Sequence, residues 1–131
     1  MNRERLIMSY DDNNVFAKIL RREIPVTIIY EDEYALAFPD LNPQAPVHVL
    51  VIPKGRYISA ADFGATASPA EITGFYRALA HVGKLMKVEE RGYRIVCNIG
   101  ADGHQTVPHF HAHLLGGRSM GHDLTASNLA H

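Results

Sequence analysis

The sequence contains a single cysteine, Cys97, and it lacks both a long apolar run and an excess of charge of either sign. One cysteine excludes an internal disulfide and argues against a cysteine-rich zinc module, so a reducing compartment is compatible. Near the N-terminus only Leu6-Ile7-Met8 is apolar, which is too short for a signal-peptide core or a membrane span. The formal net charge of −1 gives no bulk attraction to nucleic acid or to a membrane surface. We therefore expect a cytoplasmic protein in which any phosphate binding comes from a local site.

The length of 131 residues indicates one domain that folds without disulfides. Residues 1–13 show no periodicity and end in the turn-forming run Asp11-Asp-Asn-Asn14, so we interpret them as a loosely held arm without a function. Residues 14–120 form the predicted domain. The polar, weakly periodic residues 121–131 are interpreted as a tail.

Two helices are predicted. Asn14 is a suitable cap for a short helix with Arg21 and Arg22 in its last turn, ended by Pro25. The run Ser68-Pro-Ala-Glu71 has the pattern of a capping box with proline at the first helical position, and helical spacing continues to about Glu89, with Gly92 closing the helix. The short helix would present one apolar face, made of Val15, Phe16, Ile19 and Leu20.

The remaining apolar runs predict about five strands, because their lengths and alternation are typical of a sheet. They span residues 26–31, 34–38, 47–52, 93–98 and the run between Pro108 and Gly116. Asp32-Glu33 is interpreted as a hairpin turn between the first two. The fold class expected is α+β, with a mainly antiparallel sheet, one short N-terminal helix and one long helix. Such a sheet can cover one face with helices and offer the other to a ligand.

The most informative stretch runs from Thr106 to Arg118 and contains three histidines at every second position. Pro108 suits the first position of a strand, and Gly116-Gly117 ends it. Side chains alternate across a sheet, so the imidazoles should share one face while the apolar residues between them face the core. The first set is His109, His111 and His113, and the second is Phe110, Ala112 and Leu114.

Three functions are compatible with aligned imidazoles, and the residues alone leave them open. The first is a metal site, to which His48 could add a ligand. Residues four apart on a strand lie about 13 Å apart, so at most two of the three could share an ion. The sequence also shows no nearby Asp–His or Glu–His partner. The second is nucleophilic catalysis on phosphorus, in which a neutral imidazole forms a covalent intermediate. The third is an exposed polar face.

The loop ahead of the histidines favours chemistry on phosphorus. Gly100 and Gly103 permit close approach of the backbone, and Asn98, Gln105 and Thr106 offer neutral donors for phosphate oxygens. This chemistry needs no metal or other cofactor.

The run His109-Phe-His-Ala-His-Leu-Leu115 resembles the defining pattern of the histidine triad superfamily, and further segments resemble its Hint branch, the histidine triad nucleotide-binding proteins. The resemblance covers about residues 14–120 with the order intact. The further segments are Phe16-Ala-Lys-Ile-Leu-Arg-Arg-Glu-Ile-Pro25, Leu36-Ala-Phe-Pro-Asp40, Pro43-Gln-Ala-Pro46, His48-Val-Leu-Val-Ile-Pro-Lys54, Gly92-Tyr-Arg-Ile-Val-Cys-Asn98 and Leu115-Gly-Gly-Arg118.

The resemblance implies a HIT-like fold and a purine nucleoside phosphoramidase, which also hydrolyses acyl-nucleotides and releases AMP or GMP. It implies that His111 is the nucleophile, that His113 and His109 assist, and that His48 is a fourth histidine supporting the network. An alternative within the superfamily is a dinucleoside polyphosphate hydrolase, suggested by the run from Gln105 to His109. A non-enzymatic alternative is a purine-nucleotide-binding protein without turnover.

The resemblance also implies a nucleotide site, although each residue in it has a plainer interpretation. Asp40 would accept the ribose hydroxyls, or it is simply a turn residue. Asn98, Gln105 and Thr106 would hold the phosphate, although the last two could merely satisfy loop backbone. An apolar slot for the base, whose residues could equally belong to the core, would be formed by Val15, Phe16, Ile19, Phe38, Leu41 and Leu50.

Members of this branch are homodimers, so the resemblance implies a dimer joined through the strand at Tyr93–Asn98 and the long helix. Pairing would also protect a bare sheet edge. Three departures from the branch concern the site. His104 stands where many members have glycine, Phe110 and Ala112 replace the usual aliphatic spacers, and the common Trp-Pro-Pro terminus is absent. Loop geometry and leaving-group preference are therefore expected to differ.

Overall fold

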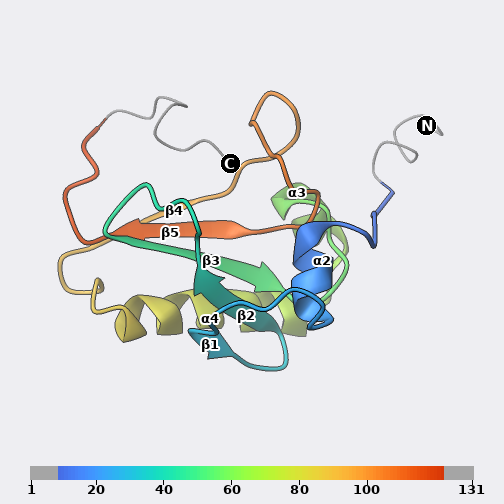
Figure 1. The fold of residues 1–131 in the computed structure, drawn as a ribbon, viewed down its shortest axis with the longest axis horizontal. Coiled ribbons are helices and arrows are strands. Elements are labelled where there is room, and N and C mark those ends of the chain that lie inside the picture. The colour runs from blue at the N-terminus through green and yellow to red at the C-terminus, as the bar shows by residue number, and fades with distance from the viewer. Residues whose placement is uncertain (1–8, 123–131) are drawn as a thin grey trace.

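The computed structural model describes residues 9–122. Most of the expected N-terminal arm, and residues 123–131 of the expected tail, therefore lie outside the described residues. The predicted α+β class is confirmed: five strands form one sheet in the order β1-β2-β3-β5-β4, and every neighbouring pair is antiparallel (Figure 1). The strands are β1 (Tyr30–Glu31), β2 (Ala35–Pro39), β3 (Val47–Pro53), β4 (Arg94–Val96) and β5 (Ala112–Gly116).

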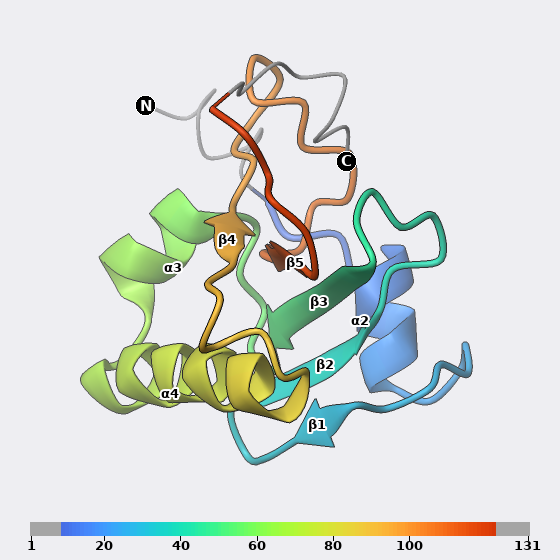
Figure 2. The ribbon, with the colours of Figure 1, turned by 90° about the vertical axis from the view of Figure 1, so that its left-hand side faces the viewer.

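Helices lie on both faces of the sheet. They are α2 (Val15–Leu20), α3 (Ala60–Thr66) and α4 (Pro69–Leu85). Figure 2 shows α3 and α4 on one side of the sheet and α2 on the other. The alternation of side chains in β2 explains two separate cores, because Ala35 and Ala37 pack toward α4 whereas Leu36 and Phe38 pack toward α2. The face of α2 is the one that the histidines share.

Both helices predicted from the sequence are present, but each ends earlier than expected. The capping box at the start of α4 is confirmed, and Asn14 caps α2 through its side-chain oxygen, which accepts from the Ala17 amide at 2.9 Å. However, α4 stops at Leu85 rather than near Glu89, and the two arginines placed in the last turn of α2 follow that helix.

The physical reason is the same at both ends. After α4, Lys87 takes a φ of 60°, its amide donates to the Lys84 carbonyl, and the next amide, of Val88, donates to the Gly83 carbonyl. This is the bonding of a Schellman motif, which closes a helix and normally uses glycine at the left-handed position. Arg22 does the same after α2, with a φ of 65°. Neither lysine nor arginine is typical of this conformation, so these two helix ends could not be predicted from the sequence.

Helix α3 was not predicted. Ser59 caps it, with its hydroxyl accepting from the Asp62 amide at 3.2 Å. Phe63 is its only buried residue, so no apolar periodicity marks the helix in the sequence.

The strand predicted to begin at Pro108 begins at Ala112, so His109 and His111 precede β5. Ahead of the strand the chain is held differently: the Phe110 amide donates to the Tyr57 carbonyl at 2.7 Å. The predicted strand at 93–98 is also shorter, and as β4 it forms one edge of the sheet, followed by the exposed Cys97. Among residues 9–122, no helix combines the length and apolarity that crossing a membrane requires.

Candidate active site

The three triad histidines are buried, which disagrees with an exposed polar face. His109 is 0% exposed, and His111 and His113 are each 3% exposed. The residues between them behave as predicted, because Phe110, Ala112 and Leu114 belong to the core under α4. Alternation therefore turns the imidazoles toward the side of α2. There, the registry of β3 with β5 places His113 opposite Leu50, and His48 opposite Leu115.

His111 is held by the main chain of its neighbour in the triad. Its Nδ1 lies 2.7 Å from the carbonyl oxygen of His109. A carbonyl only accepts, so Nδ1 carries the proton, and in the neutral ring the lone pair is on Nε2. Phe16 packs edge-on against the ring, with 4.9 Å between centroids. The ring is thereby fixed in both its tautomer and its orientation.

His48 and His113 form a hydrogen-bonded pair whose tautomers also follow from a backbone group. The Gln44 amide donates to Nδ1 of His48 at 3.0 Å, so His48 carries its proton on Nε2. That Nε2 lies 2.9 Å from Nδ1 of His113, which must accept. In the neutral pair, His113 then carries its own proton on Nε2. The 6% exposure of His48 shows that this relay is shielded from solvent.

His109 is held from both ring nitrogens. Its Nε2 donates to the Pro53 carbonyl at 2.9 Å, so Nδ1 must accept the hydroxyl proton of Tyr10, 2.5 Å away. Burial lowers the pKa of His109 to about 4, so the ring is neutral near pH 7. Tyr10 thus contacts the triad from the segment 1–13 that was interpreted from the sequence as an arm without a function. Its isolated position in a polar run gave no signal.

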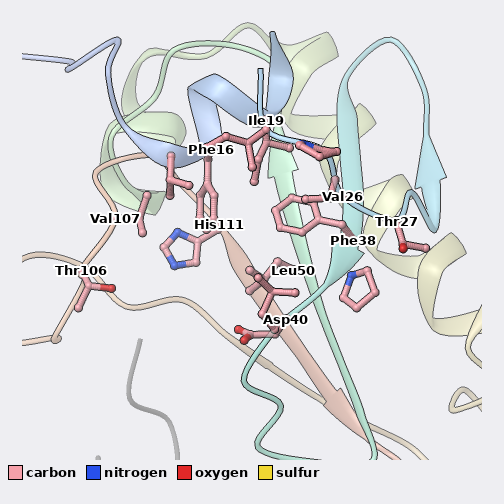
Figure 3. Close-up of a pocket in the computed structure, with 15 residues that line it drawn as sticks. Phe16, Ile19, Val26, Thr27, Phe38, Asp40, Leu50, Thr106, Val107 and His111 are labelled. Atoms are coloured by element: carbon pink, nitrogen blue, oxygen red, sulfur yellow. The ribbon is translucent and has the colours of Figure 1, made fainter. Parts of the chain in front are cut away.

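A cavity of about 730 Å³ opens beside His111, between α2 and the end of β2 (Figure 3). It is mainly apolar, and the carboxylate of Asp40 and the side chain of Thr106 are its polar contributions near the histidine. The residues assigned to the nucleotide site that line it are Val15, Phe16, Ile19, Phe38, Asp40, Leu41, Leu50 and Thr106. Leu41 is 97% exposed, so it stands at the rim.

Six further residues line the cavity and were not predicted to do so: Ile24, Pro25, Val26, Thr27, Pro39 and Val107. Four of them form the segment after α2. In the sequence, Pro25 was interpreted only as the end of a helix. The apolar residues on either side of it, Ile24 and Val26, were the available signal, and both pack against the core under α2.

Two of the predicted phosphate ligands do not line the cavity. Gln105 serves the loop itself, since its Nε2 donates to the carbonyls of Ile58 and Val107 and its Oε1 accepts from the Gly100 amide. Asn98 is half-buried after β4 and is absent from the lining. Thr106 is the member of the trio at the cavity.

Asp40 has both a turn role and a place at the cavity. Its Oδ1 accepts from the Asn42 amide at 2.8 Å, which is the bond of an Asx turn, and Oδ2 lies 3.5 Å from Nε2 of His48. From the sequence, no carboxylate was expected near a histidine, and this counted against a metal site. The structure corrects that expectation, because it brings Asp40 to His48.

Asp40, His48 and His113 each place one potential ligand atom within 4.8 Å of the others. In this arrangement, the facing nitrogens of the two histidines are hydrogen-bonded to each other at 2.9 Å. An ion would have to replace that hydrogen bond and spread the two rings.

Known proteins agree with this geometry. The family model for the HIT domain matches residues 21–120. A 13.2 kDa HIT-like protein of Azospirillum brasilense is 53% identical over 117 residues, which are 89% of this chain and 96% of that protein. The 14 kDa zinc-binding protein of Zea mays is 44% identical over 119 residues, covering 90% of this chain and 93% of its own.

Among solved structures, a HIT family hydrolase from Clostridium thermocellum superposes with a TM-score of 0.80 at 42% identity, over 88% of this chain and 99% of its own. A domain match of this extent, relatives of this identity and three buried histidines ahead of and within β5 lead to one conclusion. The chain belongs to the histidine triad (HIT) family.

Proposed function

We propose that the protein is a purine nucleoside phosphoramidase of the Hint type, which hydrolyses nucleoside 5′-phosphoramidates and acyl-nucleotides to the nucleoside monophosphate. The observation that carries this proposal is the tautomer of His111. Its Nδ1–H is committed to the His109 carbonyl, so the lone pair needed by a nucleophile sits on Nε2, beside the cavity. HIT membership and the hydrolase name of a solved relative support the reaction class.

The cavity supports a nucleotide as the substrate. Its volume of about 730 Å³ is within the usual range for small-molecule sites. Phe16 and Phe38, packed edge-on with 5.7 Å between centroids, form an apolar wall suited to a purine. The Asp40 carboxylate would accept from the ribose hydroxyls, and Thr106 would donate to a phosphate oxygen.

In the first half-reaction, Nε2 of His111 forms a bond to the α-phosphorus while the bond from phosphorus to the amine nitrogen breaks. The departing amine takes its proton from Nε2 of His113 in the protonated His48–His113 pair, which thereby becomes neutral. In the second half-reaction, water attacks the phosphorus, the bond to His111 breaks, and the water proton returns to the histidine network. The His109 carbonyl, 2.7 Å from Nδ1 of His111, stabilises the positive charge that the nucleotidyl-imidazole carries between the two steps.

The test is His111→Asn, assayed with a fluorogenic adenosine phosphoramidate. We expect turnover to fall by about three orders of magnitude or more while AMP still binds, because only the nucleophile is removed. His81→Asn is the matched control, since His81 is exposed and packs on Tyr30 away from the cavity. Wild-type levels of turnover in the His111 variant would refute the assignment.

Two additions to the same assay separate the alternatives. An excess of chelator should leave turnover unchanged, because no step passes through a metal. A diadenosine polyphosphate tested beside the phosphoramidate should be the poorer substrate; the reverse order would favour a dinucleoside polyphosphate hydrolase. Trapping of a nucleotidyl adduct on His111 would exclude a binding protein without turnover.

The active form is proposed to be a homodimer joined through β4 and α4. β4 is an edge strand, and Ile95 within it is 43% exposed. Leu85, the last residue of α4, is 47% exposed. Apolar residues on an unpaired edge favour pairing with a second copy of the chain.

A further inference from the structure

Tyr10 contacts the triad from a segment that precedes the HIT domain match at residue 21. Its hydroxyl reaches Nδ1 of His109, and the two rings meet edge-on with 5.6 Å between centroids. The direction of the bond is fixed, because the other nitrogen of His109 already donates to the Pro53 carbonyl. Tyr10 therefore donates, and His109 accepts in a single tautomer.

The segment around Tyr10 is tied down by its neighbours. Asp12 accepts from Nε and Nη2 of Arg56, at 2.9 Å in both cases, and the Arg56 guanidinium lies over the Tyr10 ring, 5.1 Å from its centre. Arg21, just past α2, donates to the Asp12 carbonyl at 2.8 Å. Loop and helix together thus hold Tyr10 against the triad. Burial raises the pKa of Tyr10, so the phenol keeps the proton that it donates.

Tyr10 acts at a distance from the reacting atoms. It does not line the cavity, whereas the His109 it contacts supplies the carbonyl that orients His111. Two hydrogen bonds therefore link Tyr10 to the proposed nucleophile through His109: the Tyr10 hydroxyl donates to the His109 ring, and the His109 carbonyl accepts from Nδ1 of His111. The ring is joined to that main chain through Cβ, so holding the ring in place also restrains the main chain beside the carbonyl.

We propose that Tyr10 is a positioning residue for the triad: by donating to Nδ1 of His109, whose tautomer the Pro53 carbonyl fixes, it holds that ring in place and so supports the carbonyl that aligns His111. The role deepens the proposed function and rests on it only where turnover is the measurement. The tautomer of His109 can be measured without any substrate.

The experiment compares Tyr10→Phe with the wild type, using Tyr30→Phe as the matched control. Tyr30 donates its hydroxyl to Asp32 at 2.8 Å, away from the cavity, so the control removes one tyrosine hydrogen bond elsewhere. Long-range proton–nitrogen NMR spectra of histidine-labelled protein report which ring nitrogen carries the proton. We expect the Nδ1 signal of His109 to lose its hydrogen-bonded shift in Tyr10→Phe and to be unchanged in Tyr30→Phe.

Turnover gives the second measurement. With a nucleoside phosphoramidate, kcat of Tyr10→Phe should fall by about three- to tenfold, the effect of losing one neutral hydrogen bond, while KM changes by less than about twofold. An unchanged His109 spectrum in folded Tyr10→Phe overturns the proposal, as does an equal loss of kcat in Tyr30→Phe. A wild type with no turnover but with the expected NMR change would reject the proposed function and keep Tyr10 as the residue that holds the His109 ring.

Discussion

His109 has no solvent-exposed surface, and both of its ring nitrogens are occupied by hydrogen bonds that suit the neutral ring. Protonation would put a second donor opposite the Tyr10 hydroxyl and a charge in a buried site. The pKa of His109 is accordingly lowered to about 4, with burial as the main cause and the adjacent His111 as a minor one. The ordinary value for histidine is about 6.5.

This difference predicts how stability depends on pH. Between about pH 4 and pH 6.5 the unfolded chain binds a proton at position 109 that the folded protein does not, so stability is lost as pH falls through this window. The loss attributable to His109 should approach about 3 kcal/mol. Urea unfolding at pH 7, 5.5 and 4.5 should show that the stability advantage of the wild type over His109→Gln shrinks toward acid. Parallel profiles would contradict the neutral, buried state.

Side-chain identities at the site were predictable, but the atoms that set their protonation were not. The alternation of His109, His111 and His113 follows from strand geometry, and the assignment of Asp40 came from resemblance. The tautomers depend on three backbone groups, the His109 and Pro53 carbonyls and the Gln44 amide. Every residue carries such groups, so only the fold reveals which of them faces an imidazole. Tyr10 was missed for a related reason, since nothing local distinguishes it.

At the scale of elements, two glycines within helices differ in whether their surroundings require a glycine. An added Cβ at Gly64, in α3, would meet nothing within 4 Å. At Gly74, in α4, it would lie 2.2 Å from Cδ2 and 2.4 Å from Cγ of Tyr34, whose ring packs on the helix backbone. Gly74 is therefore required by the contact between α4 and the β1–β2 hairpin, whereas Gly64 only weakens α3.

The two alanine substitutions should consequently shift stability in opposite directions. Gly64→Ala should stabilise the protein by about 0.5–1 kcal/mol through helix propensity. Gly74→Ala should destabilise it by about 1–3 kcal/mol, because the ring must move out of a packed site. Urea unfolding of each variant measures both values, and adding Tyr34→Ala to Gly74→Ala should recover part of the loss. If both single variants changed the free energy of unfolding in the same direction, the contact of Tyr34 with position 74 would not determine the effect of the substitution.

For each of the two predicted helices, the first residue was predicted more accurately than the last. The first turn of α4 is set by the capping box of Ser68 and Glu71, and the first turn of α2 by the cap Asn14. Residue types of this kind can be recognised in the sequence. Both ends depend on a left-handed residue that is not glycine. His104 is a third such residue, with a φ of 59°, at the position where many Hint proteins have glycine.

For the whole molecule, the two edges of the sheet offer a test of the proposed dimer. Light scattering should give the mass of a dimer for the wild type, and Ile95→Asp, in edge strand β4, should give a monomer because a charge would be buried between the copies. Ile28→Asp is the matched control. Ile28 is 45% exposed, against 43% for Ile95, and it lies beside β1 at the opposite edge. A monomeric wild type, or dissociation by the control alone, would contradict pairing through β4.

The architecture itself followed from the sequence because its signals are local: apolar runs, turns and one strong capping box. The cavity is a property of the assembled chain, since residues after α2, at the end of β2 and beside His111 meet only when the sheet forms. The family resemblance predicted most of the residues that line the cavity. It omitted the segment from Ile24 to Thr27, where one wall of the cavity is plain coil.

The bond between Nδ1 of His111 and the His109 carbonyl has a consequence for mutagenesis. Substitutions of residue 109 remove the imidazole ring but leave the main-chain carbonyl oxygen that accepts from His111. An ester in place of the amide that follows residue 109 would spare the ring and weaken the oxygen as an acceptor, and it would also remove the Phe110 amide that donates to the Tyr57 carbonyl. Comparing the two kinds of replacement would separate the contribution of the His109 ring from that of the His109 carbonyl oxygen.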